Sequence, residues 1–182
     1  MKSHDREHKI LLVMHEFSRT GAPRAMLYLA RALSHLTGFH PMVIAAIDGP
    51  IRLEFEAERI STKVEPLLFE ASSSLSPVAD FVAEFDKVIV TPLASFAFIR
   101  HLGQKVKYLV WWIHEEEQGF NYIAENFAPD LSDIFNACDA IWLGSPLCTL
   151  QLRNMQPQKN CIYCYTAAMT SPQNSVQCAR DL

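Results

Sequence analysis

The chain has 182 residues, of which 49% are hydrophobic, so it can bury one core of ordinary size but is short for two full domains. Its 16 basic and 20 acidic side chains give a formal net charge of -4, which argues against a general nucleic-acid-binding or anionic-membrane surface. The apolar stretches are shorter than the roughly 18 residues that a membrane span needs, and no secretory signal precedes them, so we expect a cytoplasmic protein.

The stretch Ile10–Leu36 begins as an apolar run, crosses a polar loop and continues with apolar residues at helical spacing. This pattern predicts a strand, a tight turn and a helix. Gly21 permits close approach of a ligand to the backbone, and Pro23 suits the first helical turn. Arg19 and Arg24 add positive charge where a helix amino terminus also attracts anions, so the loop is expected to bind a phosphate. A glycine that serves only to pack the turn is the alternative.

Further strands and helices alternate along the chain. The predicted strands are Pro41–Ile47, Thr62–Phe69, Lys87–Thr91, Val106–Ile113, Ala140–Leu143 and Asn160–Tyr165. The predicted helices are Arg52–Arg59, Val78–Phe85, Leu93–Leu102, a region broken by Pro129 with Leu131, Ile134 and Phe135 on one face, and Pro146–Met155. This alternation indicates an α/β fold with a doubly wound, mostly parallel sheet and helices on both faces. The most hydrophobic strand, Val106–Ile113, should be central and covered on both faces.

Five cysteines, an odd number in a chain with a good core, indicate reduced thiols and not a disulfide framework. Cys161 and Cys164 form a CxxC pair. On a strand, residues three apart point to opposite faces, which disfavours a shared metal. We therefore expect buried, inert cysteines and no metal site.

Segments that follow parallel strands meet at one edge of the sheet, where ligands bind. In this chain these segments are Glu16–Pro23, Asp48–Pro50, Thr91–Pro92, His114–Gly119 and Gly144–Pro146. They supply histidine, carboxylate, hydroxyl and arginine side chains, of which the strand interiors contain almost none. The sequence therefore predicts one polar crevice, although every doubly wound sheet places some polar turns there.

His114 directly follows the apolar residues WWI and precedes three glutamates, Glu115 to Glu117. The carboxylates would favour the imidazolium and burial would oppose it, so its charge is open, but either form can hydrogen-bond a sugar hydroxyl. A capping or core-edge histidine is an equal alternative. The glutamates are expected in the first turn of a helix. Glu16, at the end of the first strand, more simply satisfies loop backbone groups.

Several enzyme motifs are absent from the sequence. Ser145 lacks the GxSxG setting of a hydrolase nucleophile. No GK[ST] follows Gly21, and the next glycine is Gly38, so neither a P-loop nor a dinucleotide fingerprint is present. A nicotinamide-dependent oxidoreductase therefore has little support.

Four segments stand out in the chain, namely HEFSRTGAPRAMLYLARAL, DGPIRLEFEAERI, VWWIHE and DAIWLGSP. Together they resemble the amino-terminal domain of GT-B glycosyltransferases, most closely the large retaining family 4, also called group 1. The resemblance covers Ile10–Tyr165 and implies two Rossmann-like domains that together transfer a sugar from a nucleotide-diphosphate sugar to an acceptor hydroxyl. It implies no metal or other cofactor, and a role in bacterial polysaccharide synthesis.

The resemblance also implies roles for individual residues. His114 would be the catalytic residue that contacts the transferring sugar. Donor phosphate or sugar would be bound by Arg19, Thr20, Gly21 and Ala22, and acceptor-side or supporting roles would fall to Glu16, Arg24, Glu115 and Ser145.

The carboxyl-terminal domain that holds the nucleotide in this family is missing from the chain. We therefore expect an acceptor-binding half-enzyme, inactive alone, whose partners are that domain and a sugar or glycan acceptor, with no nucleic acid. Residues 1–9 are expected to be disordered or extended, 10–166 to form the domain and 167–182 to be a tail or linker. Homodimerisation and peripheral contact with the inner face of the membrane stay open. The alternative is a self-contained, flavodoxin-like binding or regulatory domain for a phosphate-bearing ligand or a protein.

Overall fold

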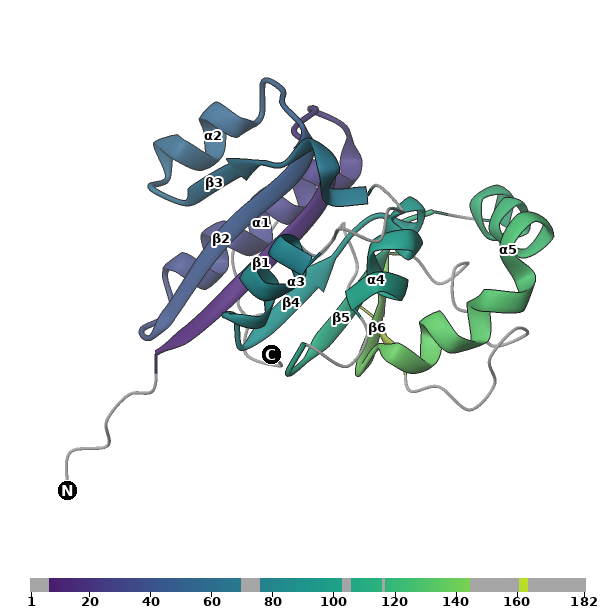
Figure 1. The fold of residues 1–182 in the computed structure, drawn as a ribbon. Coiled ribbons are helices and arrows are strands. Elements are labelled where there is room, and N and C mark those ends of the chain that lie inside the picture. The colour runs from purple at the N-terminus through teal and green to yellow at the C-terminus, as the bar shows by residue number, and fades with distance from the viewer. Residues whose placement is uncertain (1–6, 70–75, 103–105, 116, 145–160, 164–182) are drawn as a thin grey trace.

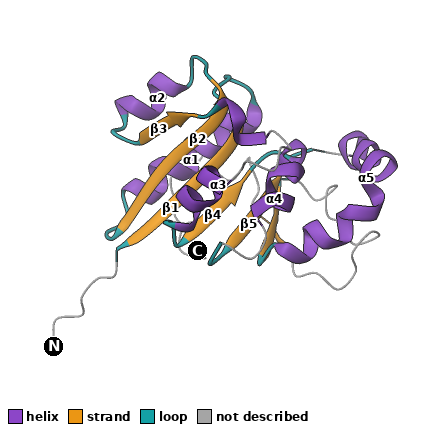
Figure 2. Cartoon of the chain, viewed as in Figure 1, coloured by secondary structure: helices purple, strands orange, loops and turns teal. Residues whose placement is uncertain are grey.

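The structure is a computed structural model that describes residues 7–69, 76–102, 106–115, 117–144 and 161–163 (Figure 1). The described strands form one seven-stranded sheet in the order β3-β2-β1-β4-β5-β6-β7, and all neighbouring pairs are parallel. Helices lie on both faces of this sheet (Figure 2). The predicted doubly wound α/β fold is therefore confirmed.

The strands are β1 (His8–Glu16), β2 (Phe39–Ile47), β3 (Ser61–Val64), β4 (Lys87–Val90), β5 (Leu109–Ile113), β6 (Ala140–Leu143) and β7 (Cys161–Tyr163). The helices are α1 (Gly21–Ser34), α2 (Arg52–Ala57), α3 (Ser76–Ala83), α4 (Phe96–Leu102) and α5 (Glu117–Ala137), with short 3-10 turns η1 (Pro66–Phe69) and η2 (Leu93–Ser95). Among the described residues, no helix combines the length and the apolar character that crossing a membrane requires.

The core has two layers because side chains alternate along each strand. On β1, Leu11 and Val13 point into the layer that also holds residues of α3, α4 and α5, whereas Ile10 and Leu12 point into the layer built on α1 and α2. In Figure 1, α1 lies behind the sheet and α3 and α4 lie in front of it. Burial on both faces explains why the strands read as continuous apolar runs.

Two predicted strands are several residues shorter than expected, and the strand predicted over Lys87–Thr91 ends one residue early, at Val90. The strand predicted over Thr62–Phe69 ends at Val64, and Pro66–Phe69 forms η1, because Pro66 has no N–H to donate to a sheet ladder. The strand predicted over Val106–Ile113 begins at Leu109. All five residues of β5 are buried, as expected, but the central strand of the sheet is its neighbour β4.

The predicted break of the helix at Pro129 is wrong. α5 continues from Glu117 to Ala137 as one helix that changes direction along its length (Figure 1). A proline costs one helical hydrogen bond, and Ile134 and Phe135, which are buried in the core, hold the second part of the helix on the sheet. Gly119, assigned to the preceding loop, lies in the first turn of α5.

Several predictions fall on residues that the structure does not describe. They are Ser145, the helix Pro146–Met155, Cys164, the tail 167–182 and the side chain of Leu131. At the amino terminus, β1 begins at His8, so the last two residues of the segment 1–9 belong to the strand.

Candidate functional site

The order of the strands creates a crevice between β1 and β4. After β1 the chain adds β2 and β3 on one side, and it then returns to add β4 on the other side. At such a switch point, loops after neighbouring strands diverge and leave room for a ligand at the carboxyl edge. A cavity of about 190 Å³ lies there, lined by the end of β1, the start of α1, the residues after β4 and Glu115 after β5. Its polar lining residues are His15, Glu16, Thr20, Thr91 and Glu115.

Four residues singled out from the sequence line this cavity, namely Glu16, Thr20, Ala22 and Glu115. Gly21 is exposed beside them, and a Cβ added to it would meet no atom within 4 Å. Tight packing therefore does not require glycine here, which excludes the packing alternative. The open space is consistent with close approach of a ligand to this turn.

The amino terminus of α1 is left without a side-chain cap. Thr20 occupies the cap position, but its hydroxyl lies 2.8 Å from the hydroxyl of Ser18 and does not bond the first turn. The N–H groups of Gly21 and Ala22 have no acceptor within the part of the chain that the structure describes. Two free donors and the positive end of the helix can bind an anion or a hydroxyl group here.

Arg19 and Arg24, both expected near a phosphate, contact Glu54 of α2. Arg19 Nε lies 2.9 Å and Arg24 Nη1 3.6 Å from the carboxylate oxygens of Glu54. No lysine or arginine is among the described residues that line the cavity. The sequence could not reveal this pairing, because Glu54 lies on another helix and its spacing from Arg19 follows no local pattern.

His114 lies beyond the end of β5 and packs between two neighbours. Its ring centroid is 4.5 Å from that of Trp112, and a Cβ added to Gly144 would lie 3.1 Å from Nδ1. Its Nε2 is buried and has no hydrogen-bond partner among the described residues. Burial lowers the pKa of His114 from 6.5 to about 4. The imidazole is therefore neutral near pH 7, which resolves the charge left open by the sequence, and it does not itself line the cavity.

Glu115 joins the ends of two strands. Its Oε2 accepts hydrogen bonds from the N–H of His114 at 3.1 Å and from the N–H of Leu93, in η2 after β4, at 3.0 Å. The carboxylate is thereby held in a defined position at the cavity wall. The sequence predicts the acidic triplet in the first turn of a helix; α5 begins at Glu117, so the prediction is wrong for Glu115, and Glu116 lies outside the described residues.

Thr91 lies in one of the predicted crevice segments, and no signal in the sequence marks it as a site residue. Its side chain is fully buried, and its Oγ1 has no hydrogen-bond partner in the described residues. Its backbone is fully used, since its N–H donates to Val13 and its carbonyl accepts from Ser95 Oγ, both at 2.9 Å. The hydroxyl is the one group of this buried cavity-lining residue that lacks a partner.

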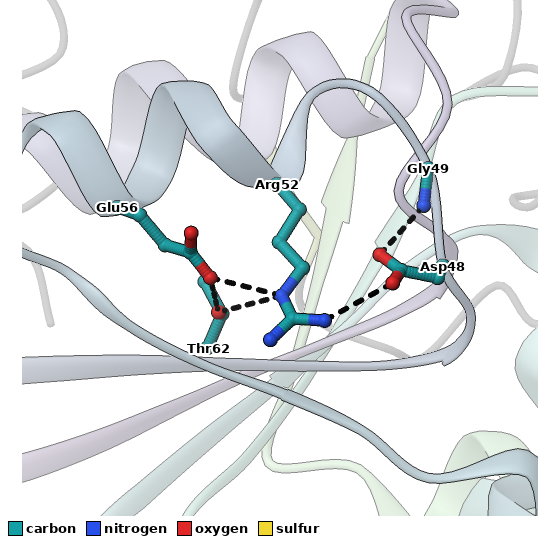
Figure 3. A network of polar contacts seen from close by, with 5 residues as sticks. All are labelled: Asp48, Gly49, Arg52, Glu56 and Thr62. Carbon is teal, nitrogen blue, oxygen red and sulfur yellow. Dashed lines mark hydrogen bonds and ion pairs between the residues drawn. The ribbon is translucent and has the colours of Figure 1, made fainter.

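A second surface hollow, of about 530 Å³, lies at the start of α2. Figure 3 shows its charged network, in which Arg52 contacts Asp48 at 3.1 Å and Glu56 at 2.9 Å, and Thr62 bonds Glu56. A side chain on Gly49 would collide with the backbone of Phe17. These groups satisfy one another, so the network stabilises the turn between β2 and α2 and leaves few groups for a ligand.

Within the described ranges, no three His, Cys, Asp or Glu side chains are grouped to hold a metal ion. Cys161 lies in β7, whereas its CxxC partner lies outside the described residues.

Comparison with known proteins places the chain in a family. Residues 6–134 match the family model described as Glycosyl-transferase family 4. The fold is similar to crystal structures of Anabaena Alr3699/HepE in complex with UDP-glucose (TM-score 0.65, 14% identity) and with UDP and glucose (TM-score 0.63, 14% identity). The matches cover 88% and 87% of this chain but 44% of HepE, so the chain spans less than half the length of that protein. No curated protein sequence matches.

Proposed function

The chain belongs to glycosyl-transferase family 4, and we propose that it is the acceptor-side half of an enzyme that moves a sugar from a nucleotide-diphosphate sugar to an acceptor hydroxyl. The observation that carries the proposal is the polar cavity at the switch point between β1 and β4, beside the uncapped start of α1. Support also comes from HepE, which shares the fold and was solved with UDP-glucose. We place the reaction in bacterial polysaccharide synthesis on the basis of the family resemblance.

The partner of this half is a carboxyl-terminal domain that binds the nucleotide. The proposal assigns residues 10–166 to the amino-terminal domain and 167–182 to the segment that leads out of it. The coverage of 44% of HepE supports this division, because that protein has more than another domain's length beyond the matched part. No metal is required by the proposed chemistry, since helix N–H groups can carry the negative charge of a diphosphate.

In this proposal each group of the site has a distinct part. The N–H groups of Gly21 and Ala22 face the departing diphosphate and stabilise its charge as the bond to the sugar breaks. His114 does not line the cavity, but its buried Nε2 has no partner among the described residues, so its neutral ring could offer a hydrogen bond to a hydroxyl of the transferring sugar from behind the cavity wall without adding positive charge. Glu115 accepts a hydrogen bond from the N–H of His114 and so fixes the position of this residue just after β5.

The proposal is tested by measuring transfer from UDP-sugars by the chain joined to its carboxyl-terminal domain and by the 182-residue chain alone. We expect turnover by the joined protein and little or none by the chain alone. His114→Ala should lower turnover of the joined protein by about a hundredfold. The control is His40→Ala, an exposed histidine of β2, which should leave the rate unchanged.

Two results would contradict the proposal. Full turnover by the isolated chain would remove the need for a second domain. A joined protein that transfers no sugar from any UDP-sugar donor would refute the function itself, whereas an unchanged rate in His114→Ala would reduce that histidine to a structural residue.

A further inference from the structure

We infer that the cavity between β1, β4 and β5 binds the hydroxyl groups of an uncharged sugar ring, and that Thr91 and Glu16 determine this specificity. The inference rests on the proposed function, because it names the part of the substrates that this cavity receives. The diphosphate of the donor stays on the neighbouring N–H groups at the start of α1, as proposed above, and the cavity receives the sugar ring.

The first observation is the unpaired hydroxyl of Thr91. A fully buried polar atom without a partner is uncommon in folded proteins, because it has lost its bonds to water. The backbone bonds to Val13 and Ser95 fix the residue in place, so its hydroxyl cannot move far to find another partner. A ligand hydroxyl in the cavity would supply the missing hydrogen bond, since two hydroxyl groups can each donate or accept.

The second observation is the charge of the lining. Two carboxylate residues, Glu16 at the end of β1 and Glu115 after β5, line the wall together with His15, and no lysine or arginine is among the described lining residues. Carboxylates accept hydrogen bonds from sugar hydroxyls but repel phosphates and uronic acids. Arg19 and Arg24 both contact the single carboxylate of Glu54 and are not among the lining residues, so their charge lies outside the cavity.

The third observation is size. The cavity volume of about 190 Å³ is below the roughly 300 to 1,000 Å³ of pockets that enclose drug-sized ligands. One monosaccharide ring is therefore a better match than a whole nucleotide sugar. The rest of a donor would lie at the edge of the cavity formed by Ala22, toward the exposed Gly21.

The experiment measures the affinity of the protein joined to its carboxyl-terminal domain for UDP, UDP-glucose and UDP-glucuronate by calorimetry. The three probes share the nucleotide; UDP lacks the sugar ring, and the other two differ only in the carboxylate of glucuronate. Thr91→Val keeps the shape of the side chain and removes the hydroxyl. It should therefore weaken the binding of UDP-glucose about 3- to 10-fold and leave the affinity for UDP unchanged. Thr91→Ser restores the hydroxyl and should recover most of the affinity, which separates loss of the bond from loss of folding.

Charge is tested by a second variant. The unaltered protein should bind UDP-glucuronate at least tenfold more weakly than UDP-glucose. Glu16→Gln should reduce this ratio of the two dissociation constants several-fold, because it removes one negative charge from the wall. Matched controls lie in the network at α2, where Thr62→Val and Glu56→Gln make the same chemical changes away from the cavity. Neither control should alter the preference among the three probes.

A further arm identifies the source of the ring. If the cavity holds the acceptor and not the donor sugar, Thr91→Val should weaken binding of methyl glucoside, methyl mannoside or methyl galactoside to the UDP-saturated protein and spare UDP-glucose. The inference is overturned if Thr91→Val and Glu16→Gln change neither set of affinities, or if no uncharged ring adds affinity in either arm. If Thr91→Val and Glu16→Gln leave the rate of sugar transfer unchanged, this inference alone is contradicted. If Thr91 contributes to binding of the ring but the joined protein transfers no sugar, only the proposed function is contradicted.

Discussion

The buried imidazole of His114 makes the stability of the fold depend on pH. Its pKa lies near 4 in the folded protein and near 6.5 when exposed, so the unfolded chain binds the extra proton between these values. The stabilisation from this group is complete above about pH 6.5 and is lost as the pH falls through about 4. The full loss is about 3 kcal/mol, from roughly 1.4 kcal/mol per pKa unit.

Two measurements check this prediction. NMR titration of the folded chain should place the midpoint of the His114 ring signals near pH 4. The free energy of unfolding of a His114→Gln variant should fall less between pH 6.5 and pH 4 than that of the unaltered chain. A ring that titrates near pH 6.5 would show that His114 is solvated, and it would remove the argument for a neutral hydrogen-bonding group.

At the level of single residues, the sequence identified the surroundings of the site better than its contacts. It placed Glu16, Thr20 and Glu115 correctly at one sheet edge, because the ends of apolar runs mark the ends of parallel strands. It could not find Thr91 as an unpaired hydroxyl, since this depends on the backbone pairing of β4 with β1. The charge of His114 also required the packing of Trp112 and Gly144 around the ring.

At the scale of elements, Glu115 fastens the end of β5 to the turn that follows β4. Glu115→Ala should leave the N–H groups of Leu93 and His114 without their acceptor, and it should lower the free energy of unfolding by about 2 kcal/mol. Glu115→Gln keeps an acceptor oxygen and should cost less than half as much. Glu125→Ala, on an exposed position of α5, is the control and should stay within about 0.5 kcal/mol.

Chemical denaturation of the three variants and the unaltered chain measures these differences. Equal stability of Glu115→Ala and the Glu125→Ala control would show that the two strand ends are held together by other contacts. The cavity wall would then not depend on this carboxylate.

The elements themselves were largely predictable because each strand is buried on both faces and each crossover needs a helix. β6 was predicted with its observed bounds, since Ala140–Leu143 is apolar throughout and flanked by polar residues. The errors occur where one residue competes with a longer pattern. Pro66 ends β3 early although the apolar pattern continues to Phe69. Pro129 does not end α5, because Ile134 and Phe135, which follow it in the same helix, are buried in the core.

At the scale of the whole molecule, the strand order brings together groups that are far apart in the sequence. Glu16, Thr91 and Glu115 meet because β1, β4 and β5 are neighbours that all run in the same direction. The same geometry leaves the carboxyl edge as the surface on which a second domain can close over a substrate. The chain covers 44% of HepE, which is consistent with one side of such a two-domain enzyme.

The most direct test of this account is a crystal structure of the chain joined to its carboxyl-terminal domain and bound to UDP-glucose. The account predicts the diphosphate within hydrogen-bond distance of the N–H groups of Gly21 and Ala22, and a sugar ring in the cavity with a hydroxyl about 3 Å from Thr91 Oγ1. A nucleotide sugar bound at the amino-terminal edge of the sheet, or a ring that leaves Thr91 and Glu16 untouched, would contradict it.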